Sequence, residues 1–284
     1  MSFKRIKFVT DSAADVPLEL AQKWGITVVP IFINIRDESH ADDGERFSRE
    51  DYYDNLPTIN PLPTTAAPSP GLTQQMIHEA FEGADHLVII TLPTQLSATY
   101  DAMRLGASEL PQDRITLIDS GSVSMAMGFQ VLIAAEVAAE TGDLEEVLDA
   151  IARVRSARKL AAIIPTLEYL RRSGRVNMAT AGLGALLRVK PILTVEDGNV
   201  QALARVRTMK RAKEALAQML KEAGPLDRVA LLHTNNLEAL EQFRDEMGDL
   251  LPEEIHMINA TPAIGTHIGP QCLGFVTIKQ SWRN

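Results

Sequence analysis

Hydroxyl side chains gather where a buried strand passes into a helix, and a junction of this kind can hold an anion. Residues 86–91, His-Leu-Val-Ile-Ile-Thr, form a continuous apolar run typical of a strand buried on both faces of a parallel sheet. Thr94, Ser97 and Thr99 follow this run, and Ser97 stands where the N-cap of the next helix is expected. The carboxyl end of a parallel strand beside a helix N-terminus offers free N–H groups and the positive end of the helix dipole. Because the loop between them holds no lysine, glycine or carboxylate, we expect it to bind one small anion through neutral donors.

Another hydroxyl-bearing turn and two basic positions also have the composition of ligand contacts. Ser120 lies in a turn, Asp-Ser-Gly-Ser, that follows a short apolar run and leads into a helix. Arg175 follows Ser-Gly, and His267 lies in the run Gly-Thr-His-Ile-Gly-Pro, whose glycines predict a tight turn that lets the backbone approach a ligand. An isolated arginine is usually a surface charge and an isolated histidine is usually structural, so neither residue identifies a function by itself.

The signatures of common enzyme classes are missing from the sequence. It contains neither the G-x-x-x-x-G-K-[ST] phosphate loop nor the G-x-S-x-G nucleophile elbow. Its 6 histidines lack the spacing typical of metal ligands. We therefore expect no nucleotide cofactor and no metal.

Alternating strands and helices must position these residues in the first half of the chain. Strands are predicted at 5–10, 26–35, 86–91 and 114–118, and helices at 17–24, 72–82 and 123–139. Repeated strand–turn–helix units require a parallel sheet covered on both faces. Pro30 indicates that the strand at 26–35 is bent or lies at an edge, and Ser48 suits the N-cap of a short helix. The prolines of 56–71 exclude regular structure and predict a stiff, ordered loop, a feature more often functional than idle.

The predicted helix at 123–139 has two interpretations. It is almost wholly apolar and rich in small residues, so it should be buried. In the more common case it is a central core helix. In the alternative, its small and methionine side chains also line an apolar tunnel.

The pattern changes after a surface helix predicted at 144–159. A hairpin over 191–206, helices at 208–223 and 236–248, and strands at 228–234, 254–259 and 273–278 follow. The fold class is therefore α/β. An N-terminal three-layer domain with a mainly parallel sheet, residues 1–160, precedes a C-terminal α+β domain with a mixed sheet, residues 161–284.

Charge and cysteine content limit the possible partners and the compartment. The net charge of −9 argues against nucleic-acid binding. Residues 153–213 hold 14 of the 28 Lys and Arg and only three acids, a net charge of +11. This basic segment is either a solvated face or a surface turned to a phosphate or an acidic partner. The single cysteine, Cys272, fits a reducing compartment, and apolar runs stop well before membrane-spanning length. Asp11 interrupts the first apolar run, so no signal peptide is expected. These features predict a cytoplasmic protein without stable membrane insertion.

Seven short motifs, in order along nearly the whole chain, resemble those of the DegV family. They are Thr10-Asp-Ser-Ala-Ala-Asp15, Pro63-Thr-Thr-Ala-Ala-Pro-Ser-Pro-Gly71, Ser97-Ala-Thr-Tyr100, Ile118-Asp-Ser120, Leu167-Glu-Tyr-Leu-Arg-Arg-Ser-Gly-Arg175, Lys190-Pro-Ile-Leu193 and Gly265-Thr-His-Ile-Gly-Pro270. Each motif is short, but seven in register make the resemblance specific.

The resemblance implies a bacterial lipid-binding protein of phospholipid metabolism that needs no cofactor. Such a protein holds a long-chain fatty acid in a tunnel near the domain interface. It presents the carboxylate to a separate fatty acid kinase, which forms the acyl phosphate. By motif, Thr65 and Ser97 are expected to hold the carboxylate. The residues expected in the vicinity of the head group or its phosphate are Arg175, His267, Ser120 and Ala98.

Three alanines depart from the family pattern. Ala66 and Ala67 replace the usual Ser-Gln after the threonine, which removes two polar groups from the head-group loop. Ala98 replaces the usual glycine after Ser97 and adds a methyl group beside the ligand. Head-group geometry or ligand choice is therefore expected to differ.

Two other functions remain open at the level of sequence. In an acyl-transfer or hydrolytic enzyme, Ser97 is the nucleophile and His267 the base. No feature of the sequence supplies the oxyanion hole or the orienting acid that this enzyme needs. Phosphotransfer by the protein itself requires a nucleotide site, and the sequence shows no motif for one.

Overall fold

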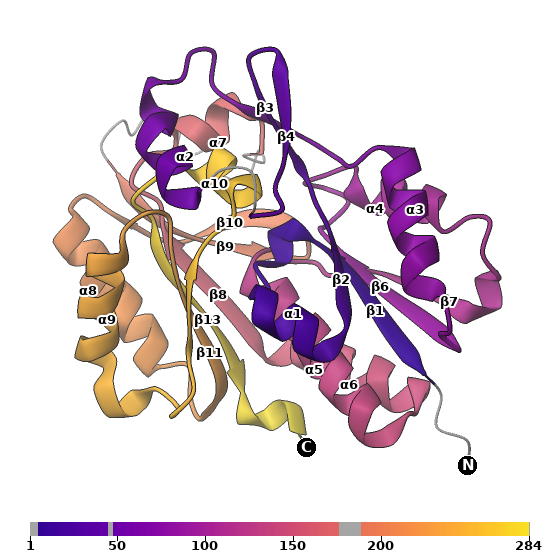
Figure 1. Cartoon of the computed structure of the whole chain (residues 1–284). Helices are drawn as coiled ribbons and strands as arrows, with labels where there is room; N and C mark the ends of the chain where they lie inside the picture. Colours follow the sequence, from indigo (N-terminus) through magenta and orange to yellow (C-terminus); the bar gives the residue numbers. More distant parts are fainter. Residues whose placement is uncertain (1–4, 45–47, 176–188, 284) are drawn as a thin grey trace.

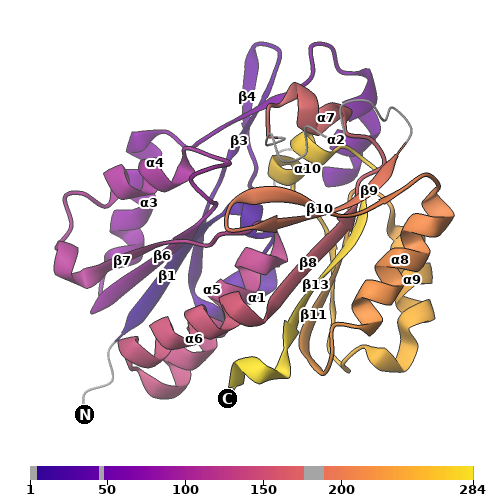
Figure 2. The same ribbon diagram turned by 180° about the vertical axis from the view of Figure 1, so that it is seen from behind.

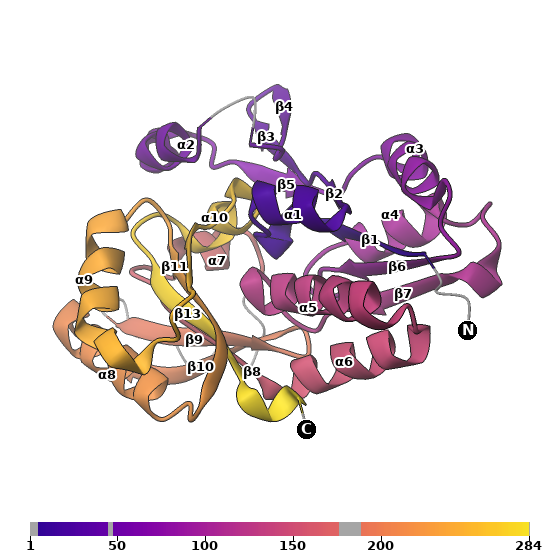
Figure 3. The same ribbon diagram turned by 60° about the horizontal axis from the view of Figure 1, so that its bottom comes forward.

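Two sheets flank a pair of helices in the computed structural model, which describes residues 5–44, 48–175 and 189–283. Helices α5 (Met125–Thr141) and α6 (Leu144–Ala157) lie between a parallel sheet and a mixed sheet (Figures 1 and 3). A small third sheet extends from the parallel sheet.

The N-terminal sheet has four parallel strands and helices on both faces. Its order is β2 (Ile26–Val29), β1 (Ile6–Asp11), β6 (His86–Thr91) and β7 (Ile115–Asp119). Side chains alternate along β6: Leu87 and Ile89 pack in the cluster shared with α3 (Pro70–Phe81) and α4 (Thr99–Gly106), whereas Val88 and Ile90 pack on the α5 side. The predicted three-layer arrangement is confirmed.

The second sheet has six strands and mixed directions, as predicted. Its order is β10 (Asn199–Val206), β9 (Lys190–Glu196), β8 (Arg158–Ile163), β13 (Leu273–Lys279), β11 (Leu226–His233) and β12 (His256–Asn259). Only β11 and β12 run parallel, and the other neighbours are antiparallel. Helices α8 (Met209–Lys221) and α9 (Leu237–Met247) cover one face, and α5 and α6 cover the other.

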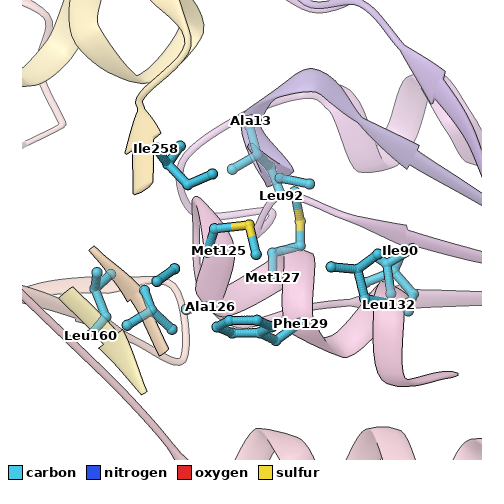
Figure 4. Close-up of a cluster of buried hydrophobic side chains, with 14 of the residues drawn as sticks. Ala13, Ile90, Leu92, Met125, Ala126, Met127, Phe129, Leu132, Leu160 and Ile258 are labelled. Carbon is cyan, nitrogen blue, oxygen red and sulfur yellow. The ribbon is translucent and has the colours of Figure 1, made fainter. Parts of the chain in front are cut away.

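Helix α5 belongs to the core of both halves. Residues 125–135 are all buried. Figure 4 shows Phe129 between Leu160 of β8 and Ile90 of β6, so one helix fills the space between the two sheets. The core interpretation of this helix is confirmed. The alternative was that the helix also lines an apolar tunnel. Val123 and Ser124, the two residues immediately before the helix, line an apolar cavity.

The prediction of one strand over 26–35 is wrong. Strand β2 ends at Val29, and β3 (Phe32–Ile35) begins after Pro30 in a different sheet, with the order β4 (Glu38–Ala41), β3 and β5 (Thr64–Ala66). Pro30 has no N–H to continue a sheet ladder, so the chain leaves the parallel sheet there. Helix α2 (Arg49–Asn55) follows, and Ser48 caps it by accepting the N–H of Asp51 at 2.9 Å.

The proline-rich segment 56–71 is also more regular than predicted. Residues 64–66, between Pro63 and Pro68, pair with β3 as the short strand β5, and α3 begins at Pro70. Three residues free of proline are enough for the antiparallel pairing of Thr65 with Ile33. The segment is stiff, but it contributes an edge strand.

Other differences lie at helix ends. The predicted helix at 144–159 ends at Ala157, and β8 follows directly. Helix α7 (Glu168–Arg172) was not expected, and His267 lies in helix α10 (Pro262–Ile268), not in a tight turn. Ser97 is not the N-cap of α4, because the cap position is Ala98, although Ser97 Oγ does accept the N–H of Thr99 at 3.2 Å. The division at residue 160, inside β8, stays a prediction.

Candidate functional site

Thr65 and His267 meet across the two halves of the chain. Thr65 is held on β5, and His267 belongs to α10. Thr65 Oγ1 and His267 Nε2 lie 2.9 Å apart, a hydrogen-bonding distance. Both side chains are half-buried. Motifs separated by 202 residues therefore form one polar pair.

The environment of the imidazole indicates how its proton is placed. Burial, and then the positive charge of Arg175, lower the pKa of His267 to about 4, so the ring is neutral at pH 7. Its Nδ1 is buried and has no hydrogen-bond partner among the described residues. A buried N–H without a partner is costly, so we assign the proton to Nε2, which donates to Thr65 Oγ1. The hydroxyl hydrogen of Thr65 is then free for a ligand.

Arg175 connects this pair to the loop that carries Ser97. Its Nε donates to the carbonyl of Leu96 at 3.4 Å, and Nη1 donates to the carbonyl of Ser173 at 2.6 Å. Ser97 Oγ lies 2.8 Å from Thr99 Oγ1. Thr65, His267, Arg175 and the Ser97 loop therefore occupy one region, in which the only formal charge on these side chains at pH 7 is that of the guanidinium.

Ser120 and the alanine replacements have different surroundings. Ser120 is fully buried, and its hydroxyl donates to the carbonyl of Ser122 at 2.9 Å, which commits it to the turn after β7. Ala98 is exposed and has φ −77° and ψ 4°, a conformation that alanine adopts without strain. Ala66 and Ala67, next to Thr65, are half-buried.

An apolar cavity of about 90 Å³ lies beside the polar region. On the same measure one water needs roughly 10–15 Å³, so the cavity has room for several methylene groups. It lies on the face of the six-stranded sheet turned toward α10 and the start of α5, and its walls include Leu160, Ala162, Leu193, Leu232, Ile264 and Ile268. Ile268, which directly follows His267, packs in one hydrophobic cluster with Leu193 of the cavity wall. Leu96, which directly precedes Ser97, packs in this cluster too. The apolar and polar regions are therefore neighbours.

Small residues in the central strands create this space. Ala162 of β8 and Gly274 of β13 are direct cross-strand neighbours, and both line the cavity. A Cβ atom on Gly274 would lie 2.7 Å from the carbonyl oxygen of Ala161, so only glycine fits there. Sequence reasoning missed both residues. The signal for Ala162 is the apolar run 160–164, where no strand was predicted, and Gly274 lies in a strand that was predicted, at 273–278.

The tip of the β9–β10 hairpin packs against the loop that leads to Ser97. In Figure 2 this hairpin extends from the mixed sheet toward the parallel sheet. Gly198 has φ +75°, and a Cβ atom there would lie 2.1 Å from Gln95 Oε1. Its N–H donates to the carbonyl of Gly121 at 3.1 Å, and the neighbouring Asp197 pairs with Arg155 at 2.7 Å. The tip of the hairpin therefore packs against two loops of the parallel sheet, including the one that leads to Ser97.

Three buried carboxyl groups lie at or just after the ends of β1 and β4. Burial raises the pKa of Asp11 to about 7 and that of Asp42 to about 6, and it also raises the pKa of Asp15. Each accepts hydrogen bonds from backbone N–H groups: Asp11 from Leu92 and Ala13, Asp15 from Thr261, and Asp42 from Ala263. These acids join segments of the fold, and within the described ranges no group of three His, Cys, Asp or Glu could hold a metal ion.

Among the helices of residues 5–44, 48–175 and 189–283, none has both the length and the apolar character needed to span a membrane.

The whole chain is similar to one protein family. The family model DegV, described as an uncharacterised protein of the DegV family, matches residues 5–280. A DegV domain-containing protein of Caldanaerobacter subterraneus subsp. tengcongensis is 31% identical over 280 residues, which cover 95% of this chain and 98% of that protein. The structure of a DegV family protein of Thermus thermophilus, described by its fatty acid binding, is also similar. It has a TM-score of 0.89 and 32% identity, and the match covers 97% of this chain and 99% of that protein. DegV of Bacillus subtilis, a fatty acid binding protein, has a TM-score of 0.84 and 27% identity over 97% and 100%.

These matches span nearly the full length of the chain, and the Thermus thermophilus structure has the same overall fold. The chain belongs to the DegV family.

Proposed function

We propose that this protein binds a long-chain fatty acid, with its tail in the apolar cavity and its carboxylate at Thr65 and Ser97. The observation that carries the proposal is that one helix, α10, contributes to both regions. Ile268 lines the cavity, and the adjacent His267 bonds to Thr65. Fatty acid binding by the Thermus thermophilus and Bacillus subtilis relatives supports it.

Burial of the tail supplies most of the affinity. Each methylene removed from water contributes about 0.8 kcal/mol, so about six methylenes in the cavity contribute roughly 5 kcal/mol before entropy costs. Charge-assisted hydrogen bonds to the carboxylate add about 1.5–3 kcal/mol each. The tail therefore determines affinity, and the hydroxyls determine orientation.

The head group meets mainly neutral donors. With the proton of His267 on Nε2, the hydroxyl of Thr65 donates to the carboxylate, and Ser97 is the second expected donor. Arg175 is the nearby charge suited to an added phosphate. A carboxylate held by neutral donors keeps its nucleophilic electron pair. Ala66, Ala67 and Ala98 replace polar or smaller neighbours, so the relative preference among fatty acids is expected to differ from that of relatives with Ser-Gln and Gly.

The carboxylate is then presented to a separate fatty acid kinase, and the carrier itself needs no cofactor and performs no catalysis. The carboxylate oxygen attacks the γ-phosphorus of ATP and ADP leaves, giving the acyl phosphate. The alternative, an acyl-transfer enzyme, requires His267 to bond Ser97. In this structure His267 Nε2 bonds Thr65, and Ser97 Oγ bonds Thr99. The geometry therefore favours the carrier.

The ligand and the head-group contact are tested together. Protein extracted under denaturing conditions should release a long-chain fatty acid in about stoichiometric amount, identified by mass spectrometry. Thr65→Val keeps the side-chain shape but removes the hydroxyl, so the affinity for hexadecanoic acid should fall by about 10-fold or more. The affinity for its methyl ester should change little. A cavity that stays empty after incubation with several fatty acids refutes the proposal.

Presentation to a kinase has its own test. Loaded protein, ATP and a bacterial fatty acid kinase should form an acyl phosphate, which hydroxylamine traps as the hydroxamate. Omission of the carrier is the control. Equal hydroxamate with and without the carrier would contradict the presenting role while leaving fatty acid binding intact.

A further inference from the structure

Helix α10 lies near the end of the chain, but side chains from the first 55 residues of the chain hold it in place. It packs beside α2, whose residues lie more than two hundred positions earlier (Figure 1). Asp15 accepts the N–H of Thr261 at 2.7 Å, and Asp42 accepts the N–H of Ala263 at 3.1 Å. Both carboxylates therefore satisfy N–H groups at the start of α10 that have no partner within the helix.

Two adjacent tyrosines of α2 hold the rest of the helix. Tyr53 is fully buried and donates to the carbonyl of Ala260 at 2.8 Å. Its ring fills the space beside Gly265, where a Cβ atom would lie only 2.0 Å from the tyrosine oxygen. Tyr53 therefore fixes how closely α10 approaches α2.

Tyr52 reaches the residue next to His267. Its hydroxyl lies 2.6 Å from Thr266 Oγ1, and Thr266 Oγ1 in turn donates to the carbonyl of Pro262 at 2.7 Å. A threonine hydroxyl has one hydrogen, and it is given to Pro262, so Tyr52 is the donor to Thr266. Tyr52 is buried, with 4% of its surface exposed, so water does not replace this bond cheaply.

We propose that Tyr52 is a positioning residue of the head-group site. It holds Thr266, and with it His267, at hydrogen-bonding distance from Thr65 on β5. The inference rests on the fatty-acid-binding function proposed above. Thr65 and His267 belong to different segments of the fold, and a shift of α10 by a fraction of an ångström lengthens their 2.9 Å contact. The free hydroxyl hydrogen of Thr65 then loses its orientation.

The test separates the head group from the tail. In Tyr52→Phe only the hydroxyl is lost, and we expect about a tenfold weaker affinity for hexadecanoic acid and less than about a twofold change for its methyl ester. Thr58→Val is the matched control. Thr58 lies just beyond α2, and its exposed hydroxyl donates to the carbonyl of Asn55, the last residue of that helix. This control should change neither affinity. Isothermal titration calorimetry with delipidated full-length protein measures all of them.

A second background shows whether Tyr52 acts through Thr65. In a Thr65→Val background, Tyr52→Phe should cause no further loss of acid affinity. Thr266→Ser, which keeps the hydroxyl, should bind hexadecanoic acid like the parent protein. If Tyr52→Phe does not fold, Thr266→Val removes the other partner of the same bond and gives the same test.

The outcomes are distinguishable. Equal losses for acid and ester in Tyr52→Phe, no loss for either, or a full tenfold acid loss in the Thr65→Val background would each overturn the positioning role. Failure of the parent protein to bind either ligand would instead refute the proposed function.

Discussion

Filling the cavity at Ala162 tests where the acyl tail lies. Ala162 is half-buried, lines the cavity and pairs directly with Gly274 and Leu193 in neighbouring strands. Ala162→Leu adds three carbon atoms at this position. If they displace about three methylenes of the ligand, the loss is about 0.8 kcal/mol each, or about 2.4 kcal/mol, which weakens binding about fifty-fold.

The chain-length profile is the assay. Affinities for decanoic, dodecanoic, hexadecanoic and octadecanoic acids should be measured by competition with a fluorescent fatty acid. The loss should be largest for the long acids, because a short tail leaves part of the cavity unfilled. The unfolding free energy of the ligand-free variant should change by less than about 1.5 kcal/mol, since the added atoms enter existing space.

A matched substitution controls for the added apolar surface. Ala152 lies exposed on α6, so Ala152→Leu should leave the whole chain-length profile unchanged. An unchanged affinity of Ala162→Leu for hexadecanoic acid would show that the tail does not use this cavity. An equal loss for all four acids would also refute the reasoning, because displacement of distal methylenes must depend on chain length.

Two further predictions concern stability. Burial raises the pKa of Asp11 from 3.8 to about 7, so between these values the folded state binds more protons than the unfolded state. The Asp11 contribution should therefore favour folding at low pH and fall by roughly 4 kcal/mol as the pH rises from about 4 to about 7, at about 1.4 kcal/mol per unit. Urea unfolding of the parent protein and Asp11→Asn across this range measures it, and a constant difference between them would contradict it. Gly265→Ala places a Cβ atom against buried Tyr53 and should cost about 3 kcal/mol, whereas Gly71→Ala, in an open part of helix α3, should stabilise by about 0.5–1 kcal/mol. Equal midpoints for the two glycine variants would rule out the close contact at Gly265.

Local sequence patterns were sufficient for the elements whose own residues signal their burial or their ends. The apolar run 86–91 predicted a strand buried on both faces, and the structure uses alternate residues of this strand in the cores above and below it. The uniform apolar surface of α5 predicted its burial for the same reason. Ser48 showed where α2 begins, because a cap is a contact within three residues.

Patterns failed where a distant partner decided the structure. The strand at 26–35 divides at Pro30 because its second half pairs with β4 and β5 rather than with β1. Strand β8 follows α6 without a turn signal, and it becomes a strand because it pairs with both β9 and β13. The motif around His267 reads as a glycine-rich turn, but Asp15, Asp42 and the α2 tyrosines stabilise it as a helix.

The sequence by itself determined the fold class, the family and the chemical types in the candidate site: hydroxyls, one imidazole and one guanidinium. Only the tertiary structure decided which of them meet. Thr65 bonds His267, Ser120 is committed to its own turn, and Ser97 bonds Thr99 instead of the histidine. The physical reason is that hydrogen bonds act over about 3 Å, while the partners are 202 residues apart in sequence. Their meeting depends on how α10 packs against the N-terminal half, and no local pattern encodes that distance.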